Sequence, residues 1–186
     1  MGVRIIRQRT ERQVGPVTVI EKHKSQPTSD NYTFQIETAL LRESYKYLLS
    51  MGRDESLLYI GGTINREENL ITATDIFLPE MSRRETGRVT ADRSSTHDIM
   101  TLLDEKNLAL AVLAHVHPGI GRNSVYPSSL DIQTQRGYEA CYKSIGVIFS
   151  RNNYFRFYSD RLKFNLKLVG SNIKKVDAEQ PIYYFV

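Results

Sequence analysis

Two histidines separated by a single residue, His115 and His117, follow an apolar run over 108–114. The run predicts a buried β-strand, and side chains two residues apart leave the same face of a strand. Both imidazoles can therefore bind one metal ion without distorting the backbone. Asp131 offers a carboxylate further along the chain. Two histidines and a carboxylate are typical of a catalytic zinc, because three protein ligands leave a fourth position for water.

The same residues also have a structural interpretation. A single histidine in a strand is more often a polar core residue that hydrogen-bonds the backbone. Here two histidines enter the loop 118–121, which contains a proline and two glycines, and metal ligands often lie in such loops at strand ends. Ser128 and Asp131 have the spacing of a capping box that starts a helix. Capping is compatible with metal binding, since the first turn of a helix favours a negatively charged carboxylate.

Hydrolysis at such a metal also needs a proton acceptor, and Glu55 is the best candidate. It comes directly before an apolar run that contains Leu57 and Tyr59. An apolar setting of this kind raises the pKa of a carboxylate toward the working pH of a general base. Asp54 is the adjacent competitor. Either residue could instead be an ordinary charged residue at a corner between a helix and a strand.

The elements that must position these residues follow from hydrophobic periodicity and turn signals. We expect helices over 35–51, from Ser95 or Thr96 to about residue 106, and over 128–143. We expect strands over 17–20, 56–64, 69–78, 108–114, 145–150, 154–158, 162–168 and 181–186. The strands within 56–78 and within 145–158 predict hairpins, and the charged stretch 79–95 predicts a long surface loop. The sequence therefore predicts an α/β domain in which a mixed, curved β-sheet packs against helices.

Length and composition are those of one globular domain. The chain has 186 residues, of which 40% are hydrophobic and 25% charged, which is enough for a sizeable core. Residues 1–30 carry six Lys or Arg against three Asp or Glu, so most of the net charge of +4 lies there. We expect residues 1–30 to be a basic arm and linker, and 31–186 to be the functional domain. Nucleic-acid binding through residues 1–30 is a less favoured alternative, because no aromatic residues interleave with these charges.

Membrane and disulfide-bonded classes are disfavoured. No stretch approaches the roughly 18 consecutive apolar residues of a membrane span, and no secretory signal is visible at the amino terminus. Cys141 is the single cysteine, which excludes an internal disulfide and a thiolate-rich zinc site. We expect Cys141 to be a small, buried hydrophobic residue of the third helix. The simplest expectation is a cytoplasmic protein with no membrane partner.

Three motifs, in this order, resemble the signature of the JAMM (MPN-plus) metalloprotease family. They are Glu55 with Gly62, the H-x-H-P of residues 115–118, and the P-S-x-x-D of residues 127–131. The expected order of elements is also similar, from about Thr33 to the carboxyl terminus, and the size is that of small prokaryotic members. The resemblance implies a JAMM-like layering of helices on the sheet, similar to that of cytidine deaminases.

The resemblance also implies a role for each motif residue. His115, His117 and Asp131 would bind one zinc ion, Glu55 would be the general acid and base, and Ser128 would assist at the oxyanion. The reaction would be cleavage of an isopeptide or peptide bond after the C-terminal tail of a ubiquitin or ubiquitin-like protein, in deconjugation or precursor processing. The family context adds companion activating and conjugating enzymes as partners, and a role in antiviral defence.

Two alternatives keep the fold but change the function. The chain could be a catalytically inactive scaffold or partner-binding domain, as some members of the wider MPN family are. His97 could also close the zinc coordination as a fourth ligand and make the site structural. We favour this second alternative less, because His97 lies near a predicted helix start, remote in sequence from the strand that ends at 114.

Overall fold

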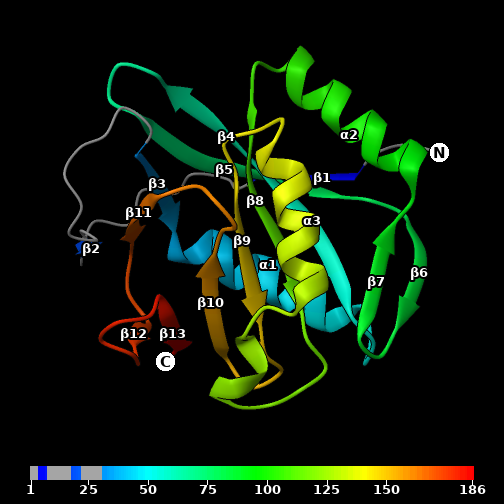
Figure 1. The fold of residues 1–186 in the computed structure, drawn as a ribbon, viewed down its shortest axis with the longest axis vertical. Coiled ribbons are helices and arrows are strands. Elements are labelled where there is room, and N and C mark those ends of the chain that lie inside the picture. Colours follow the sequence, from blue (N-terminus) through cyan, green and yellow to red (C-terminus); the bar gives the residue numbers. More distant parts are fainter. Residues whose placement is uncertain (1–3, 8–17, 22–30) are drawn as a thin grey trace.

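The computed structural model describes residues 4–7, 18–21 and 31–186. Eleven of the described strands form one curled, mixed sheet (Figure 1). They are β1 (Arg4–Arg7), β2 (Thr18–Glu21), β3 (Tyr32–Glu37), β4 (Ser56–Asn65), β5 (Leu70–Leu78), β8 (Ala109–Val116), β9 (Ile145–Phe149), β10 (Tyr154–Tyr158), β11 (Phe164–Val169), β12 (Ile173–Lys175) and β13 (Ile182–Phe185). Their order is β12-β13-β10-β9-β8-β4-β5-β3-β11-β2, and β1 pairs with β5. The predicted α/β class with a mixed sheet is confirmed.

Antiparallel pairing places the start of β4 beside the end of β8, which brings the two histidines and the candidate base together. Leu57 of β4 pairs with His115 of β8, so Glu55, which directly precedes β4, lies beside the end of β8. On its other side β8 pairs in parallel with β9, where Ile148 is the partner of His115. Both faces of β8 are buried, which explains why its sequence is continuously apolar rather than alternating.

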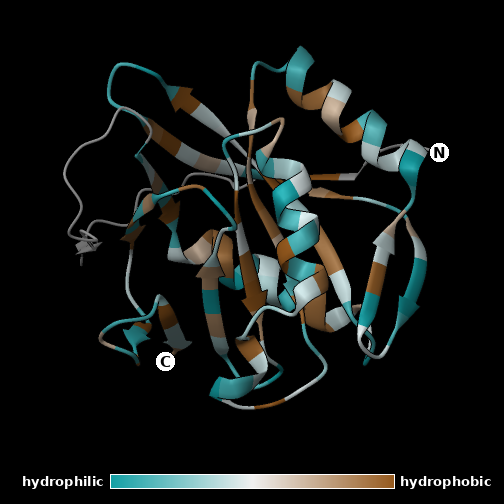
Figure 2. Cartoon of the chain, viewed as in Figure 1, coloured by the Kyte–Doolittle hydropathy of each residue, from teal (hydrophilic) through white to brown (hydrophobic). Residues whose placement is uncertain are grey.

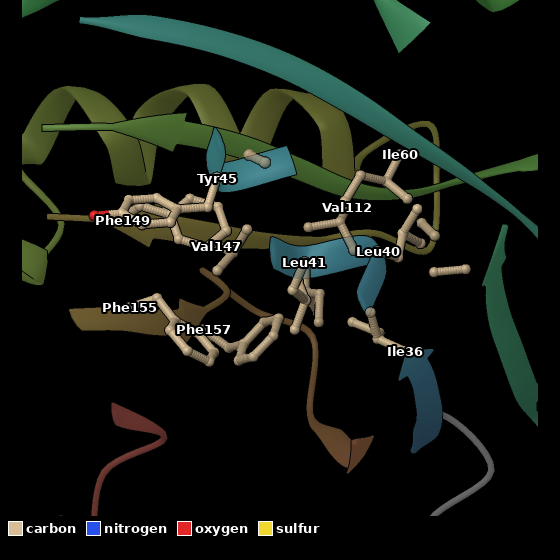
Figure 3. Packing of buried hydrophobic residues seen from close by; sticks show 14 of the residues in the cluster. Ile36, Leu40, Leu41, Tyr45, Ile60, Val112, Val147, Phe149, Phe155 and Phe157 are labelled. Atoms are coloured by element: carbon tan, nitrogen blue, oxygen red, sulfur yellow. The ribbon is translucent and has the colours of Figure 1, made fainter. Parts of the chain in front are cut away.

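Helices cover both faces of the sheet. On one face lies α1 (Thr38–Ser50), whose apolar side chains pack against β8, β9 and β10 (Figure 3). On the other face, α2 (Arg93–Glu105) buries Ile99 and Leu103 in a second cluster with residues of β4 and β8. The third helix, α3 (Ser129–Glu139), contributes Tyr138 to this second cluster. Figure 2 shows the same division, with hydrophobic residues along the central strands and hydrophilic residues over much of α2 and α3.

Most of the predicted elements are present, with shifted ends. Both predicted hairpins are confirmed, because β4 pairs with β5 and β9 with β10 in antiparallel fashion. The first helix begins at Thr38 rather than at 35, since the preceding residues complete β3, which pairs in parallel with β5 and β11. The third helix has the predicted start, but it ends at Glu139 rather than at 143. The chain has to turn after Glu139 to enter β9 at Ile145.

The prediction of a long surface loop over 79–95 is wrong. β6 (Met81–Glu85) and β7 (Arg88–Ala91) form a separate two-stranded antiparallel hairpin. Gly87 has the positive φ of 97° that its tight turn requires. Much of the hairpin is exposed, so its charged side chains carry no apolar periodicity from which strands can be predicted.

The cap of α2 also differs from the prediction. The side chain of Asp92 accepts hydrogen bonds from the backbone N–H groups of Ser94 and Ser95 at 2.9 and 3.1 Å. Asp92 is therefore the cap, and the helix begins earlier than a cap at Ser95 or Thr96 implies. The Ser95 side chain instead accepts a hydrogen bond from the backbone N–H of Glu80 at 2.9 Å, which ties the helix start to the end of β5.

The prediction that Cys141 is buried is also wrong. Its side chain is exposed. Since α3 ends at Glu139, Cys141 lies in the turn before β9 and not on the apolar face of a helix.

Residues 1–30, predicted to be a basic arm and linker, are described only in part. The predicted strand at 17–20 is present as β2, which pairs with β11, and β1 pairs with β5. The rest of this segment lies outside the described residues. Among the residues that are described, no helix has both the length and the apolar character needed to cross a membrane.

Substitution of two glycines tests how closely β4 and β5 approach, with Gly62 of β4 as the test position and Gly137 of α3 as the control. A Cβ added at Gly62 of β4 would meet the carbonyl oxygen of Thr72 at 2.4 Å, whereas one added at Gly137 of α3 would meet nothing within 4 Å. We expect Gly62→Ala to lower the free energy of unfolding by about 1–3 kcal/mol, because the backbone must move. Gly137→Ala should raise it by about 0.5–1 kcal/mol. Urea denaturation followed by circular dichroism measures both, and effects of the same sign would contradict the close approach of β4 and β5.

Candidate metal centre

His115, His117 and Asp131 converge at the end of β8. His115 is the penultimate residue of the strand and His117 follows its last residue. Their Nε2 atoms are 3.1 Å apart. Asp131 places Oδ1 3.2 Å from Nε2 of His115 and Oδ2 3.4 Å from Nε2 of His117. Among the described residues, these three therefore form a group whose potential ligand atoms all lie within 4.8 Å of one another.

The hydrogen bonding of His117 leaves its Nε2 atom free to bind a cation. Nδ1 lies 2.8 Å from the carbonyl oxygen of Ser124, and because a carbonyl oxygen only accepts, Nδ1 carries the proton. In the neutral ring Nε2 presents a lone pair toward His115 and Asp131, whereas in the protonated ring Nε2 donates to the Asp131 carboxylate. Lone pairs that point at one another repel unless a proton or a metal ion lies between them.

The charges of the three groups depend on one another. Burial disfavours the charged form of Asp131, yet hydrogen bonds with His115, His117 and Ser128 hold the pKa of its carboxyl far below the usual range. Burial likewise acts against the charged form of His117, but the Asp131 carboxylate raises the pKa of His117 above its ordinary value. Asp131 is therefore ionised at neutral pH, in the form that binds a cation.

The distances fit tetrahedral coordination of a metal ion. With bonds of about 2.0–2.1 Å, two ligands of a tetrahedral zinc lie about 3.3 Å apart. The two Nε2 atoms are separated by 3.1 Å, and each lies 3.2 or 3.4 Å from a different oxygen of the Asp131 carboxylate, so each pair is close to this value. Two imidazoles and one carboxylate suit transition metals better than calcium or magnesium, which prefer oxygen ligands. The three residues can thus hold a divalent transition-metal ion.

The start of α3 holds Asp131 in place through the predicted capping box. The Ser128 hydroxyl accepts a hydrogen bond from the Asp131 backbone N–H at 3.2 Å. In return, the Ser128 backbone N–H and hydroxyl both donate to Oδ2 of Asp131 at 2.7 Å. Oδ1 has no such second partner among the described residues and is directed toward His115. The capping residue Ser128 therefore orients the carboxylate, and its hydroxyl proton is engaged by Asp131.

Glu55 lies in the same cavity as these three residues. Its side chain is 8% exposed, and burial raises the pKa of its carboxyl, with the nearby charges of His117 and His115 opposing the shift only in part. The direction agrees with the expectation from sequence. Asp54, the competing candidate, is less buried and is not among the residues that line the cavity.

A cavity of about 560 Å³ opens from the metal centre toward the β6–β7 hairpin. Five consecutive residues, 87–91, line it. Gly87 is the turn residue before β7, and the other four are the whole of β7. Because successive side chains of a strand point to opposite faces, four consecutive lining residues indicate that the edge of β7 borders the cavity. β7 pairs with β6 alone among the described strands. Its second edge is therefore available to an extended peptide.

Two tyrosines of the cavity were missed by the sequence analysis. The hydroxyl oxygens of Tyr138 and Tyr59 lie 2.8 Å apart and share a hydrogen bond. Tyr158 packs edge-on against His115, with ring centroids 6.5 Å apart, and its buried hydroxyl has no hydrogen-bond partner among the described residues. The sequence carried one signal for Tyr158. Its strand partner Gly146 stands in an otherwise apolar strand, and a Cβ there would lie 2.3 Å from the Tyr158 ring.

Comparisons with known proteins do not assign the chain to a family. None of the known family models matches this sequence, and no curated protein is significantly similar to it. The geometry of the residues themselves is therefore the basis for any functional conclusion.

Metal binding can be tested with His97 as an internal control, since His97 is exposed and does not belong to the three-residue group. We expect the protein to bind about one equivalent of Co²⁺ with the intense visible absorption of tetrahedral coordination. His115→Ala and Asp131→Ala should each lose this absorption, because two ligands remain. His97→Ala should retain it. Titration by absorption spectroscopy measures all four proteins, and tight binding by Asp131→Ala would contradict the proposed ligand set.

Proposed function

We propose that this protein is a zinc-dependent peptidase or isopeptidase of the JAMM type that cleaves after the C-terminal tail of a ubiquitin or ubiquitin-like protein. The observation that carries the proposal is the convergence of His115, His117 and Asp131 within the cavity that also holds the buried carboxylate of Glu55. A ligand set with an open position, next to a separate proton acceptor, is the arrangement that metal-assisted hydrolysis needs.

Glu55 is the proposed general base and acid. When bound, zinc would act as a Lewis acid and lower the pKa of a coordinated water to about 7. Glu55 accepts a proton from the attacking water and returns it to the leaving amine as the C–N bond breaks. Its raised pKa suits the first step, because a carboxylate that burial makes more basic accepts a proton more readily.

Ser128 is the proposed second catalytic group. Its hydroxyl donates to Asp131 in this structure, and a hydroxyl has one proton to donate. To stabilise the oxyanion that develops on the scissile carbonyl, the hydroxyl would rotate from Asp131 toward the substrate. Asp131 would keep its bond to the Ser128 backbone N–H, at 2.7 Å, when this happens. The capping residue can therefore serve both functions without releasing the carboxylate.

The substrate chain is proposed to bind as an extra strand along β7. The available edge of β7 faces the cavity over residues 87–91, and an extended tail that pairs with it would reach the metal centre. Main-chain hydrogen bonds would supply affinity with little dependence on side chains. This mode suits the flexible C-terminal tail of a small modifier protein better than the interior of a folded domain.

The identity of the modifier rests on the family resemblance of the three motifs. The JAMM-like layering of the fold, the companion activating and conjugating enzymes, the cytoplasmic location and the part in antiviral defence belong to the same proposal. They follow by analogy from the motif residues Glu55, His115, His117, Ser128 and Asp131.

Glu55→Gln tests the proposed base. We expect this substitution to reduce cleavage of a linear ubiquitin-like fusion by about 10²–10⁴-fold, the usual contribution of general acid–base catalysis. Metal content should not change, because Glu55 is not one of the three ligands. Asp54→Asn removes the neighbouring charge and should leave the rate nearly unchanged. Steady-state cleavage assays with elemental analysis of the same samples provide both readouts, and full activity of Glu55→Gln would exclude Glu55 as the base.

N-methylated substrates test the β7 pairing. In a paired strand, alternate backbone N–H groups of the tail point toward the neighbouring edge. Methylation of the tail nitrogens, one position at a time, should therefore reduce kcat/KM at every second position by about tenfold, the loss expected from one hydrogen bond of about 1.4 kcal/mol. A uniform effect along the tail would contradict strand addition.

The second candidate function is a scaffold that binds a partner without catalysis. It predicts partner binding by a protein that contains less than about one metal ion per chain and cleaves no fusion. The three ligand distances near those of a tetrahedral site favour the enzyme.

A further inference from the structure

A second cavity, also of about 560 Å³, lies at the carboxyl end of α3, whereas the metal centre lies at the amino end of this helix. It is bordered by the last turn of α3, by the turn that leads into β9, and by the loop between β10 and β11. We call it the basic cavity. The residues that line it are Arg136, Glu139, Ala140, Tyr142, Lys143, Arg161, Leu162 and Lys163.

Cations dominate the rim of the basic cavity. Four of its lining residues are exposed Lys or Arg side chains, at positions 136, 143, 161 and 163. Asp160 pairs with Arg136 at 2.8 and 3.1 Å and with Arg161 at 3.3 Å. Lys143 and Lys163 form no ion pair within the described part of the chain. The cavity therefore keeps an excess of positive charge that a bound anion would neutralise.

The acidic lining residue, Glu139, is engaged by neutral hydrogen-bond donors of the protein. Its carboxylate accepts hydrogen bonds from the backbone N–H groups of Asp160, Arg161 and Leu162 at 2.9, 2.8 and 3.2 Å. It also accepts one from the side chain of Gln135 at 3.0 Å. Both carboxylate oxygens are thus occupied by donors of the protein itself. The same bonds fix the backbone of the loop that carries Arg161.

The lining of the basic cavity is not made of cations alone. Ala140, Tyr142 and Leu162 add one aromatic ring and aliphatic surface to it. A volume of about 560 Å³ lies within the range of roughly 300–1,000 Å³ that small-molecule sites occupy. A cavity lined by both an aromatic ring and cations is suited to a ligand that combines a flat ring with a strongly anionic group.

We propose that the basic cavity binds a phosphorylated ligand of the size of a mononucleotide. The phosphoryl group lies among the cations of the rim, and the base packs against Tyr142 and Leu162. A free nucleotide and the terminal nucleotide of a single-stranded nucleic acid both offer a phosphoryl group and a base, and the experiment below distinguishes them. The proposal is independent of the metal centre, since none of the three metal-binding residues lines this cavity.

Isothermal titration calorimetry of the full chain tests this proposal with adenosine monophosphate, inorganic phosphate and a short single-stranded oligonucleotide. EDTA is present throughout, so that a metal ion cannot hold the phosphoryl group. The test variant is Lys143→Gln with Lys163→Gln. The matched control is Lys46→Gln with Lys106→Gln, which removes the same charge from exposed positions outside both cavities.

We expect adenosine monophosphate to bind the wild type and the control alike, and the test variant at least tenfold more weakly, because two charged contacts are lost. Tyr142→Ala should weaken the nucleotide but leave inorganic phosphate unchanged, which separates loss of the ring contact from loss of charge. If the oligonucleotide binds more tightly than adenosine monophosphate, and the test variant loses this binding too, the ligand is the terminal nucleotide of a single-stranded nucleic acid. An equal loss of affinity in test and control variants, or no binding at millimolar nucleotide, would overturn the proposal.

Discussion

Three groups with lone pairs, held against one another at the end of β8, are the constraint on which the candidate site depends. Nε2 of His115, Nε2 of His117 and the Asp131 carboxylate lie 3.1–3.4 Å apart. The bond from His117 to the Ser124 carbonyl assigns the His117 proton to Nδ1, which turns the bare Nε2 toward the carboxylate. Such an arrangement is favourable when a proton or a metal ion lies between the groups, and the three residues could hold a metal ion.

Two parts of the fold maintain this arrangement. The β4–β8 register places Glu55 beside the end of β8, and a slip of one residue in this pairing would turn His115 toward the face that α1 covers. The capping box of α3 fixes Asp131 from the other side. One contribution is a long-range strand pairing and the other is a local helix cap, and the metal centre lies where they meet. The same helix continues to the basic cavity, so α3 connects both sites.

The sequence predicted what local rules determine. The spacing of His115 and His117 on an apolar strand, and the Ser128 cap with Asp131 three residues later, each depend on a few adjacent residues. The β6–β7 hairpin could not be predicted, because its exposed strands have no apolar alternation. Tyr158 was missed for another reason. Its place beside His115 follows from the pairing of β9 with β10 and from the space above Gly146, which only the assembled sheet defines.

The chemistry of the fourth coordination position distinguishes an enzyme from a scaffold. A structural metal site closes this position with a protein ligand. Here His97, the fourth ligand that the sequence offered, is exposed and lies outside the three-residue group. The cavity beside the three residues is lined by Glu55 instead. Burying a carboxylate costs free energy, and the raised pKa of Glu55 reflects that cost. A metal site that served only stability would need neither the cavity nor this carboxylate, whereas hydrolysis needs both.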